Sequence, residues 1–316
     1  MPSYQEIYAE VQTRREESSQ DFVLKKYLKK LNRISKRPTI LYASAFTEKQ
    51  TPERTLLLGR HDASCFAAAS AGLEGRELDL ILHSPGGSVP AVEQLVGYLR
   101  RRYDQLRIIV PECALSSAVL LCCAADRLIM GEHATLGPID PVVSWVHQGS
   151  SYCCSAQEVI NEFAIAQRNI NNKKNNPIIW IEKLKVYTPG LLAACKSQIE
   201  MAQAAAKRWL ETYMFHSDPA ETQKADEIVS WLSDSRQLIS SSRPVMYDLA
   251  SAKGLKVELL DDDDSFADSV MAVFFAASIK FRTGDCVKLV ANHLGKGCTF
   301  TSRRSLDSSR PARESS

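Results

Sequence analysis

A serine and two glycines are the residues of this chain whose types and spacing best suit chemistry. Ser116 lies in Ala114-Leu-Ser-Ser-Ala118, between two apolar stretches, and Gly86 and Gly87 lie in Ser84-Pro-Gly-Gly-Ser88, directly after another. An activated serine hydroxyl is a nucleophile in acyl transfer. Backbone N–H groups of glycines can stabilise the oxyanion that such an attack creates. Together the two runs predict an acyl-transfer site.

Each run also has a purely structural interpretation. A glycine pair between a strand and a helix can serve only as a tight turn, and a serine at the start of a helix is a common N-cap. A phosphate-binding loop is disfavoured, because neither G-x-x-x-x-G-K-[ST] nor G-x-G-x-x-G is present. The chemical interpretation is favoured because the two runs occur together, each after an apolar stretch.

The apolar stretches around these runs predict parallel strands of an α/β sheet. Residues 78–83, 106–110 and 127–130 are short, continuous apolar segments bounded by turn residues, as buried parallel strands are. Between them, residues 91–102 and 115–125 have the pattern of helices. This order of strands and helices is that of right-handed crossover units. Ligands collect at the carboxyl ends of such strands, which is where both runs lie.

The rest of the chain is predicted to add helices, a hairpin and two further strands to this core. Before the core, the patterns predict a helix over 4–33 that breaks near Ser18-Ser19, a strand over 39–43 and a helix over 62–71. After the core, they predict a hairpin of 142–146 with 151–154 about Gln148-Gly149, and helices over 156–170 and 188–214 joined by a polar linker over 171–176. The last predicted elements are a strand over 255–259, a helix over 266–280 and a short strand over 287–291. Residues 302–316, rich in Ser and Arg, are predicted to be a disordered tail.

Two longer segments carry a resemblance to a known family. The runs LDLILHSPGGSVPAVEQLVGYLR and IIVPECALSSAVLLCCAADRLIMGEHATLGPIDP resemble the serine dehydrogenase proteinase family. That family belongs to the superfamily of the Clp protease proteolytic subunit, signal peptide peptidase A and crotonase. The resemblance is strongest over residues 78–141 and extends more weakly from about 20 to 295.

The resemblance implies both a fold and a reaction. The fold would be crotonase-like (Clp protease-type), an α/β fold of stacked ββα units with an N-terminal helix and a C-terminal helical extension. Ser116 would be the nucleophile, and Gly86, Gly87 and the N–H of Ser117 would form the oxyanion hole for peptide hydrolysis through an acyl-enzyme. Members of the superfamily generally form homo-oligomers. We divide the chain into a helical arm (1–36), a catalytic core (37–215), a C-terminal α/β extension (216–301) and the tail (302–316).

The chain departs from the family pattern in two places, and its general base is unassigned. The nucleophile motif is usually A-M-S-A-G or A-M-S-A-A, whereas ALSSA stands here, and Ser241 and Ser242 stand where relatives often carry histidines. Signal peptide peptidases use a lysine downstream of the serine, which makes Lys173 and Lys174 candidate bases, although solvated linker lysines are the commoner case. His133, in GEHATLGPID, is the third candidate, with a structural loop histidine as the alternative.

Other polar residues near the motifs have structural interpretations. His83 precedes the glycine turn, and we expect it inside the fold and hydrogen-bonded. Asp140, in GPIDP, can orient a base or bind N–H groups of its own turn, and we favour the second. The run Asp261–Asp264 cannot direct four carboxylates at one ion, so we interpret it as solvated charge or a helix N-terminus. No metal or cofactor is predicted.

Composition excludes several classes of partner. The chain has 316 residues with a formal net charge of +2, which gives no electrostatic reason to expect nucleic acid. No apolar run approaches the roughly 18 residues of a membrane span, and the N-terminal region lacks the apolar stretch of a secretory signal. The nine cysteines include adjacent pairs, which suit neither disulfides nor a zinc site. We therefore expect a cytoplasmic protein with reduced, mostly buried thiols.

Three functions are compatible with these features. The first is a serine peptidase that acts on peptides or proteins, and it requires a lysine or histidine within reach of Ser116. The second is a catalytically inactive scaffold or binding subunit of the same fold, favoured by the ALSSA motif and the missing histidines. The third is a crotonase-type acyl-CoA enzyme, against which the serine and the S-P-G-G turn argue.

Overall fold

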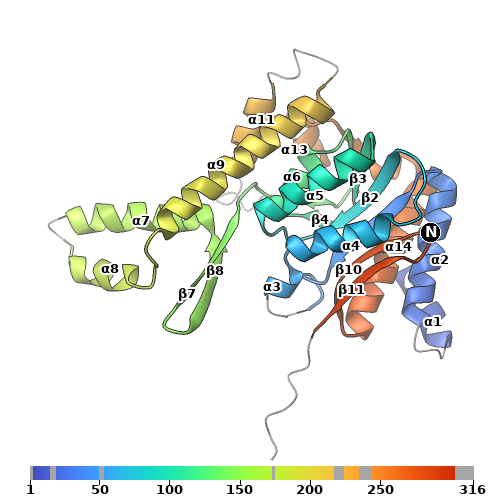
Figure 1. Ribbon diagram of the computed structural model, residues 1–316, viewed down its shortest axis with the longest axis horizontal. Coiled ribbons are helices and arrows are strands. Elements are labelled where there is room, and N and C mark those ends of the chain that lie inside the picture. The colour runs from blue at the N-terminus through green and yellow to red at the C-terminus, as the bar shows by residue number, and fades with distance from the viewer. Residues whose placement is uncertain are drawn as a thin grey trace, which may run out of the picture.

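The fold is that of an α/β protein with one large sheet and a projecting arm (Figure 1). The computed structural model describes residues 3–14, 19–49, 53–172, 175–216, 224–234 and 244–302. Within these residues, no helix is both long enough and apolar enough to cross a membrane.

The central sheet of the described residues has seven strands in the order β11-β10-β1-β2-β3-β5-β9. Its parallel strands are β1 (Thr39–Ser44), β2 (Glu77–His83), β3 (Gln105–Val110), β5 (Arg127–Met130) and β9 (Val257–Leu259). The strand β10 (Cys286–Asn292) pairs antiparallel with β1, and β11 (Gly297–Thr301) pairs antiparallel with β10. The sheet is therefore mixed, with its antiparallel strands at one side.

The strands carry apolar side chains on both faces of the sheet, and helices cover both faces. Alternate side chains of a strand point to opposite faces. On β2, Leu80 and Leu82 join the core beneath α4 (Arg60–Ser70), α5 (Val89–Arg102) and α6 (Ser117–Cys123), whereas Ile81 faces the other core. That second core is covered by α1 (Tyr4–Thr13), α2 (Ser19–Ser35) and α14 (Asp264–Thr283). Figure 1 shows the resulting helix–sheet–helix layers.

The arm extends away from the sheet on the left of Figure 1. We define it as β7 (Val142–His147), β8 (Ser150–Ser155), α7 (Ala156–Asn171), α8 (Pro177–Leu184) and the first turns of α9 (Leu191–Trp209). The hairpin turns at Gln148 and Gly149, whose φ angles of 49° and 80° match the turn type that two-residue hairpins favour. The arm has a small apolar cluster of its own.

The remaining described elements join the arm to the sheet or are short. They are α3 (Glu53–Leu56), β4 (Cys113–Ala114), β6 (Thr135–Leu136), the π-helix η1 (Leu210–Met214), α11 (Lys224–Ser233), α13 (Tyr247–Ala252) and the 3-10 turn η2 (Leu260–Asp262). The strands β4 and β6 pair in parallel with each other, outside the main sheet. They lie on either side of α6 in sequence and help to place its first residues.

Most of the elements predicted from the sequence are confirmed, and some were missed. The predicted parallel strands, the hairpin about Gln148-Gly149 and the broken N-terminal helix are all present. The prediction was wrong in giving no helix after the linker at 171–176, since α8 lies there, and no strand after β10, where β11 lies. The helix predicted over 115–125 begins at Ser117 and ends at Cys123. Of the predicted tail at 302–316, residues 303–316 lie outside the described residues. The division into domains stays a prediction.

Candidate active site

Ser116 occupies a strained position immediately before helix α6. It is the N-cap residue, with φ 51° and ψ −127°, and its side chain makes no capping bond. A positive φ is uncommon outside glycine and has an energetic cost that the surrounding structure must offset. The half-buried Ser116 Oγ donates a hydrogen bond of 2.6 Å to the backbone oxygen of Asp140. The hydroxyl thus does not cap the helix that it precedes and is bound instead to the backbone of Asp140.

The glycine turn after β2 lies directly against this serine. Gly86 has a φ of 92°, and a Cβ added there would lie 2.8 Å from Ser116 Cβ and 2.5 Å from the oxygen of Leu115. A side chain at position 86 would therefore displace Ser116. The turn is also tied to the start of β4 and α6, because Ser84 N–H bonds the Cys113 oxygen and Leu115 N–H bonds the Ser84 oxygen. The predicted meeting of the two motifs is confirmed.

Gly87 is held from the other side by the backbone of Leu58. Leu58 N–H donates to the Gly86 oxygen at 2.8 Å, and Ser88 N–H donates to the Leu58 oxygen at 2.9 Å. A Cβ on Gly87 would lie 2.1 Å from the Leu58 oxygen, so glycine is required at this close approach. Leu58 therefore fixes the orientation of the Gly86–Gly87 peptide.

A buried ion pair supports the segment that carries Leu58. Lys288 Nζ lies 2.9 Å from Asp62 Oδ2, with the two side chains 5% and 0% exposed. The same ammonium donates to the Leu57 oxygen at 2.9 Å, and Gly59 N–H donates to Asp62 Oδ2 at 2.7 Å. The brace of the glycine turn thus depends on a lysine of β10, far away in sequence.

The N–H groups of the predicted oxyanion hole have different partners. Gly87 N–H donates to Ser117 Oγ at 2.6 Å, and Gly86 N–H donates to Ser84 Oγ at 3.1 Å. No hydrogen bond from Ser117 N–H to another described residue is present. A Cβ on Gly86 would lie 2.8 Å from this nitrogen, so the Ser117 N–H lies beside the turn.

Of the candidate bases, only His133 lies in the described part of the chain. It is exposed, in the turn between β5 and β6. Its charge acts on Glu112, whose pKa is raised mainly by burial and also by Glu48, while His133 lowers it. Lys173 and Lys174 lie outside the described residues, as do Ser241 and Ser242. Within the described ranges, no lysine or histidine forms a hydrogen bond with Ser116 Oγ.

His83 is buried in the fold, as predicted, and does not face the serine. Its ring stacks on Phe46 with centroids 4.6 Å apart and meets Phe274 of α14 edge-on at 5.0 Å. Its Nε2 lies 3.3 Å from the hydroxyl of Thr47, and burial lowers its pKa to about 3. It is therefore a neutral histidine on the α14 face of the sheet.

Asp140 connects the serine to the base of the arm. Its backbone oxygen accepts from Ser116, and its carboxylate accepts from the hydroxyl of Ser155 at 2.5 Å and from Gln157 N–H at 3.4 Å. Burial raises the pKa of this carboxyl, and the bonds to Ser155 and Gln157 oppose that rise. Among the described residues the carboxylate binds one N–H group, that of Gln157 at the start of α7, and none of its own turn, so the interpretation that we favoured was wrong.

The acidic run at 261–264 belongs to a helix start, as interpreted from the sequence. Asp263 is the N-cap of α14 and accepts from Phe266 N–H at 3.0 Å, and Asp261 accepts from Glu132 N–H at 2.8 Å. No cluster of acidic, histidine or cysteine side chains suited to a metal occurs among the described residues. All nine cysteines are free thiols.

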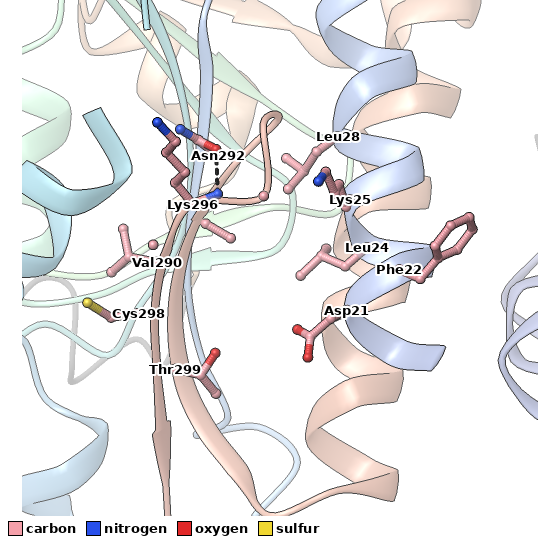
Figure 2. Close-up of a pocket in the computed structure, with 13 residues that line it drawn as sticks. Asp21, Phe22, Leu24, Lys25, Leu28, Val290, Asn292, Lys296, Cys298 and Thr299 are labelled. Atoms are coloured by element: carbon pink, nitrogen blue, oxygen red, sulfur yellow. Dashed lines mark hydrogen bonds between the residues drawn. The ribbon is translucent and has the colours of Figure 1, made fainter. Parts of the chain in front are cut away.

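A hollow of about 360 Å³ lies between α2 and the hairpin of β10 and β11 (Figure 2). It is lined by Leu24, Lys25, Asn292 and Lys296, from α2 and the hairpin of β10 and β11. The hollow runs along β10 and β11, the antiparallel strands at one side of the sheet. The serine and glycine turn lie at the carboxyl ends, and none of their residues lines the hollow.

The segment that holds Ser116 and the glycine turn is similar to a known protein family. Residues 63–159 match the family of ClpP-like SDH-type serine proteinases. This match confirms the resemblance found in the sequence. It covers the glycine turn, Ser116, Ser117 and His133, but ends before Lys173. The family implies the Clp protease fold, with which the mixed α/β architecture is consistent, and supports a serine peptidase at family level.

Two similar proteins are uncharacterised proteins of Methanocaldococcus jannaschii. One is 43% identical over 74 residues, which are 23% of this chain and 26% of the relative. The other is 39% identical over 70 residues, which are 22% of this chain and 24% of the relative. The matched part is therefore about a quarter of each relative's length.

Sequence reasoning missed three partners in this site. These are the Asp140 backbone oxygen on Ser116, the Ser117 hydroxyl on Gly87, and Leu58 behind the turn. Two of them act through backbone atoms, which any residue type provides, so the sequence carries no signal for them. The second serine of ALSSA was visible as a departure from the family motif, and that departure was the available signal for the hydroxyl.

Proposed function

We propose that this protein is a serine peptidase that hydrolyses peptide bonds through an acyl-enzyme on Ser116. The observation that carries the proposal is the contact between the strained serine and the glycine turn. A Cβ on Gly86 would lie 2.8 Å from Ser116 Cβ, so the nucleophile and the oxyanion-hole backbone are in contact. The family match supports the same reaction class.

In this proposal the turn and the serine act on one carbonyl. Ser116 Oγ attacks the carbonyl carbon of a peptide bond, its proton passes to a base, and the C–N bond breaks as the amine leaves with a proton. Water then hydrolyses the ester. The developing oxyanion accepts hydrogen bonds from the backbone of Gly86, Gly87 and Ser117. For the attack, Ser116 must exchange its bond to the Asp140 oxygen for one to the base.

The base remains a proposal among His133, Lys173 and Lys174. His133 is supported by its exposed position after a strand that adjoins β3. The lysines are supported only by their interval downstream of Ser116. Exchange of each for an uncharged residue, with the pH dependence of the reaction as the readout, distinguishes them.

An inactive scaffold is the second candidate, and one observation favours it. Ser116 Oγ donates to a backbone oxygen, and no described lysine or histidine is bonded to it. A serine without a base is a weak nucleophile. The arm suits an assembly role, because Ile178, Ile179 and Ile181 of α8 are 61%, 66% and 46% exposed.

Three finer expectations belong with this proposal. The first is the crotonase-like arrangement of stacked ββα units, supported by the family match. The second is a homo-oligomer, supported by the exposed apolar residues of α8. The third is a cytoplasmic location, supported by the nine free thiols.

Labelling with a fluorophosphonate probe tests the proposal. Ser116 Oγ would attack phosphorus, forming the P–O bond as fluoride leaves and the hydroxyl proton is released. We expect wild-type protein to be labelled and Ser116→Ala to be unlabelled, with matching circular dichroism spectra. Equal labelling of both proteins would contradict a nucleophilic Ser116. Folded protein without labelling, in the wild type and in the Ser117 variant described below, would favour the scaffold.

A further inference from the structure

The Ser117 side chain accepts a hydrogen bond from Gly87 N–H, a donor that the proposed reaction needs for the oxyanion. Its Oγ accepts the hydrogen bond from Gly87 N–H at 2.6 Å. Ser117 is only 1% exposed, so this bond lies out of contact with water. An oxyanion-hole donor is effective when it points at the place where negative charge develops. Here the donor is satisfied by the chain itself.

The peptide that carries this N–H is held at both ends. The Gly86 oxygen, which belongs to the same peptide unit as Gly87 N–H, accepts from Leu58 N–H at 2.8 Å. Rotating the peptide to offer its N–H elsewhere would break that bond. By contrast, one rotation about the Cα–Cβ bond of Ser117 moves its Oγ away from the N–H. The mobile partner in this pair is therefore the hydroxyl.

We propose that the Ser117 hydroxyl is a lock on the oxyanion hole, a positioning residue that holds Gly87 N–H until the charge of the transition state displaces it. This inference rests on the proposed peptidase function. A neutral substrate carbonyl competes poorly with a hydroxyl for the N–H, because both are uncharged acceptors. An oxyanion accepts a charge-assisted hydrogen bond, which is roughly twice as strong. The displacement therefore occurs late in the attack and slows it.

A lock and a structural brace predict opposite changes in reaction rate when the Ser117 hydroxyl is removed. If the hydroxyl merely steadies the turn, its removal loosens the oxyanion hole and slows the reaction. If it is a lock, its removal frees Gly87 N–H and accelerates the reaction. The chain offers a matched control in Ser269 of α14, which is also 1% exposed and whose hydroxyl donates to the Ser265 oxygen at 2.9 Å. Ser269→Ala removes a buried serine hydroxyl without touching any N–H group of the proposed oxyanion hole.

The test compares fluorophosphonate labelling rates of wild type, Ser117→Ala, Ser269→Ala and Ser116→Ala/Ser117→Ala. We expect Ser117→Ala to label roughly five- to tenfold faster than wild type, the factor that one net hydrogen bond is worth. The gain should lie in the maximal rate and not in the probe concentration for half-saturation, because the charge exists only in the transition state. Ser269→Ala should show no gain, and the double variant no labelling.

The outcomes separate this inference from the proposed function. Labelling that depends on Ser116 but is unchanged or slower in Ser117→Ala overturns the lock and leaves the peptidase proposal standing. No labelling of either protein at Ser116 overturns both. Labelling of Ser117→Ala alone supports both, with the lock closed in the wild type.

Hydrogen exchange of the Gly87 amide gives a readout that does not depend on activity. The bond to the buried Ser117 Oγ should protect this amide in the wild type. In Ser117→Ala we expect at least tenfold faster exchange at Gly87, while Leu58 N–H keeps its wild-type rate. Unchanged protection at Gly87 would mean that another group holds this N–H, and would overturn the lock.

Discussion

The sheet that carries the glycine turn and the arm beyond Asp140 are built differently. Alternate residues of β2 and β3, such as Ile81 and Ile109, are completely buried between two layers of helices. The arm has only a small buried cluster, and Ile179 of α8 is 66% exposed. The sheet holds its geometry by its own packing, whereas much of the arm's apolar surface has no cover from described residues. The serine lies where the two regions meet.

The largest expected difference between the two regions is in how Gly→Ala substitutions affect the labelling rate. Gly87→Ala should lower the labelling rate at least about 100-fold, because its Cβ would lie 2.1 Å from the Leu58 oxygen and displace the N–H that we propose as an oxyanion-hole donor. In the arm, Gly149 has a φ of 80° and open space around it, so Gly149→Ala should cost about 1–2 kcal/mol and leave labelling unchanged. Labelling rates and thermal denaturation measure both. Equal loss of labelling in the two variants would contradict the comparison.

The second expected effect is a pH dependence that comes from the sheet region. Burial lowers the pKa of His83 to about 3, below its ordinary value of 6.5. The unfolded chain therefore binds this proton more readily, so the stability from His83 is complete above pH 6.5 and is lost as pH falls toward 3. At pH 5 the loss is about 2 kcal/mol. Urea denaturation of wild type and His83→Leu at each pH measures this loss. If the free energy of unfolding changed equally with pH between 5 and 7 in both proteins, the pH dependence would not come from His83.

The smallest expected effect lies at the junction of sheet and arm. Ser155 Oγ accepts from Glu158 N–H at 3.2 Å and donates to the Asp140 carboxylate at 2.5 Å. Ser155→Ala should lower the free energy of unfolding by about 1 kcal/mol, the usual effect of losing an N-cap. The exposed Ser150, on the same strand, is the control, and Ser150→Ala should stay within about 0.5 kcal/mol of wild type. An effect of Ser150→Ala as large as that of Ser155→Ala would show that the junction has no special role.

The features that the sequence predicted are those set by local pattern. Gly86, Gly87 and Ser116 are recognisable because each lies in a short run next to a buried strand, and parallel strands bring such runs to one edge. The hairpin at Gln148-Gly149 is recognisable because its turn requires positive φ angles.

The features that escaped prediction depend on long-range contacts or on backbone atoms. Leu58 braces the turn through its main chain, and the support of Leu57 by Lys288 joins residues that are far apart in sequence. The helix α8 was missed because Ile178–Ile181 is a short continuous apolar run, which periodicity alone does not assign to a helix. The role of Ser117 depends on a rotamer, which no sequence pattern specifies.

The position of β10 has a consequence for how the protein is made. This strand, Cys286–Asn292, lies between β1 and β11, and its pairs with β1 join residues such as Ile40 and Asn292. During synthesis, the hydrogen-bonding edge of β1 therefore stays open until almost the whole described chain has left the ribosome. Contacts this distant in sequence form slowly, and an open strand edge invites pairing with other chains. Nascent chains that stop before residue 286 should accordingly require a chaperone or aggregate.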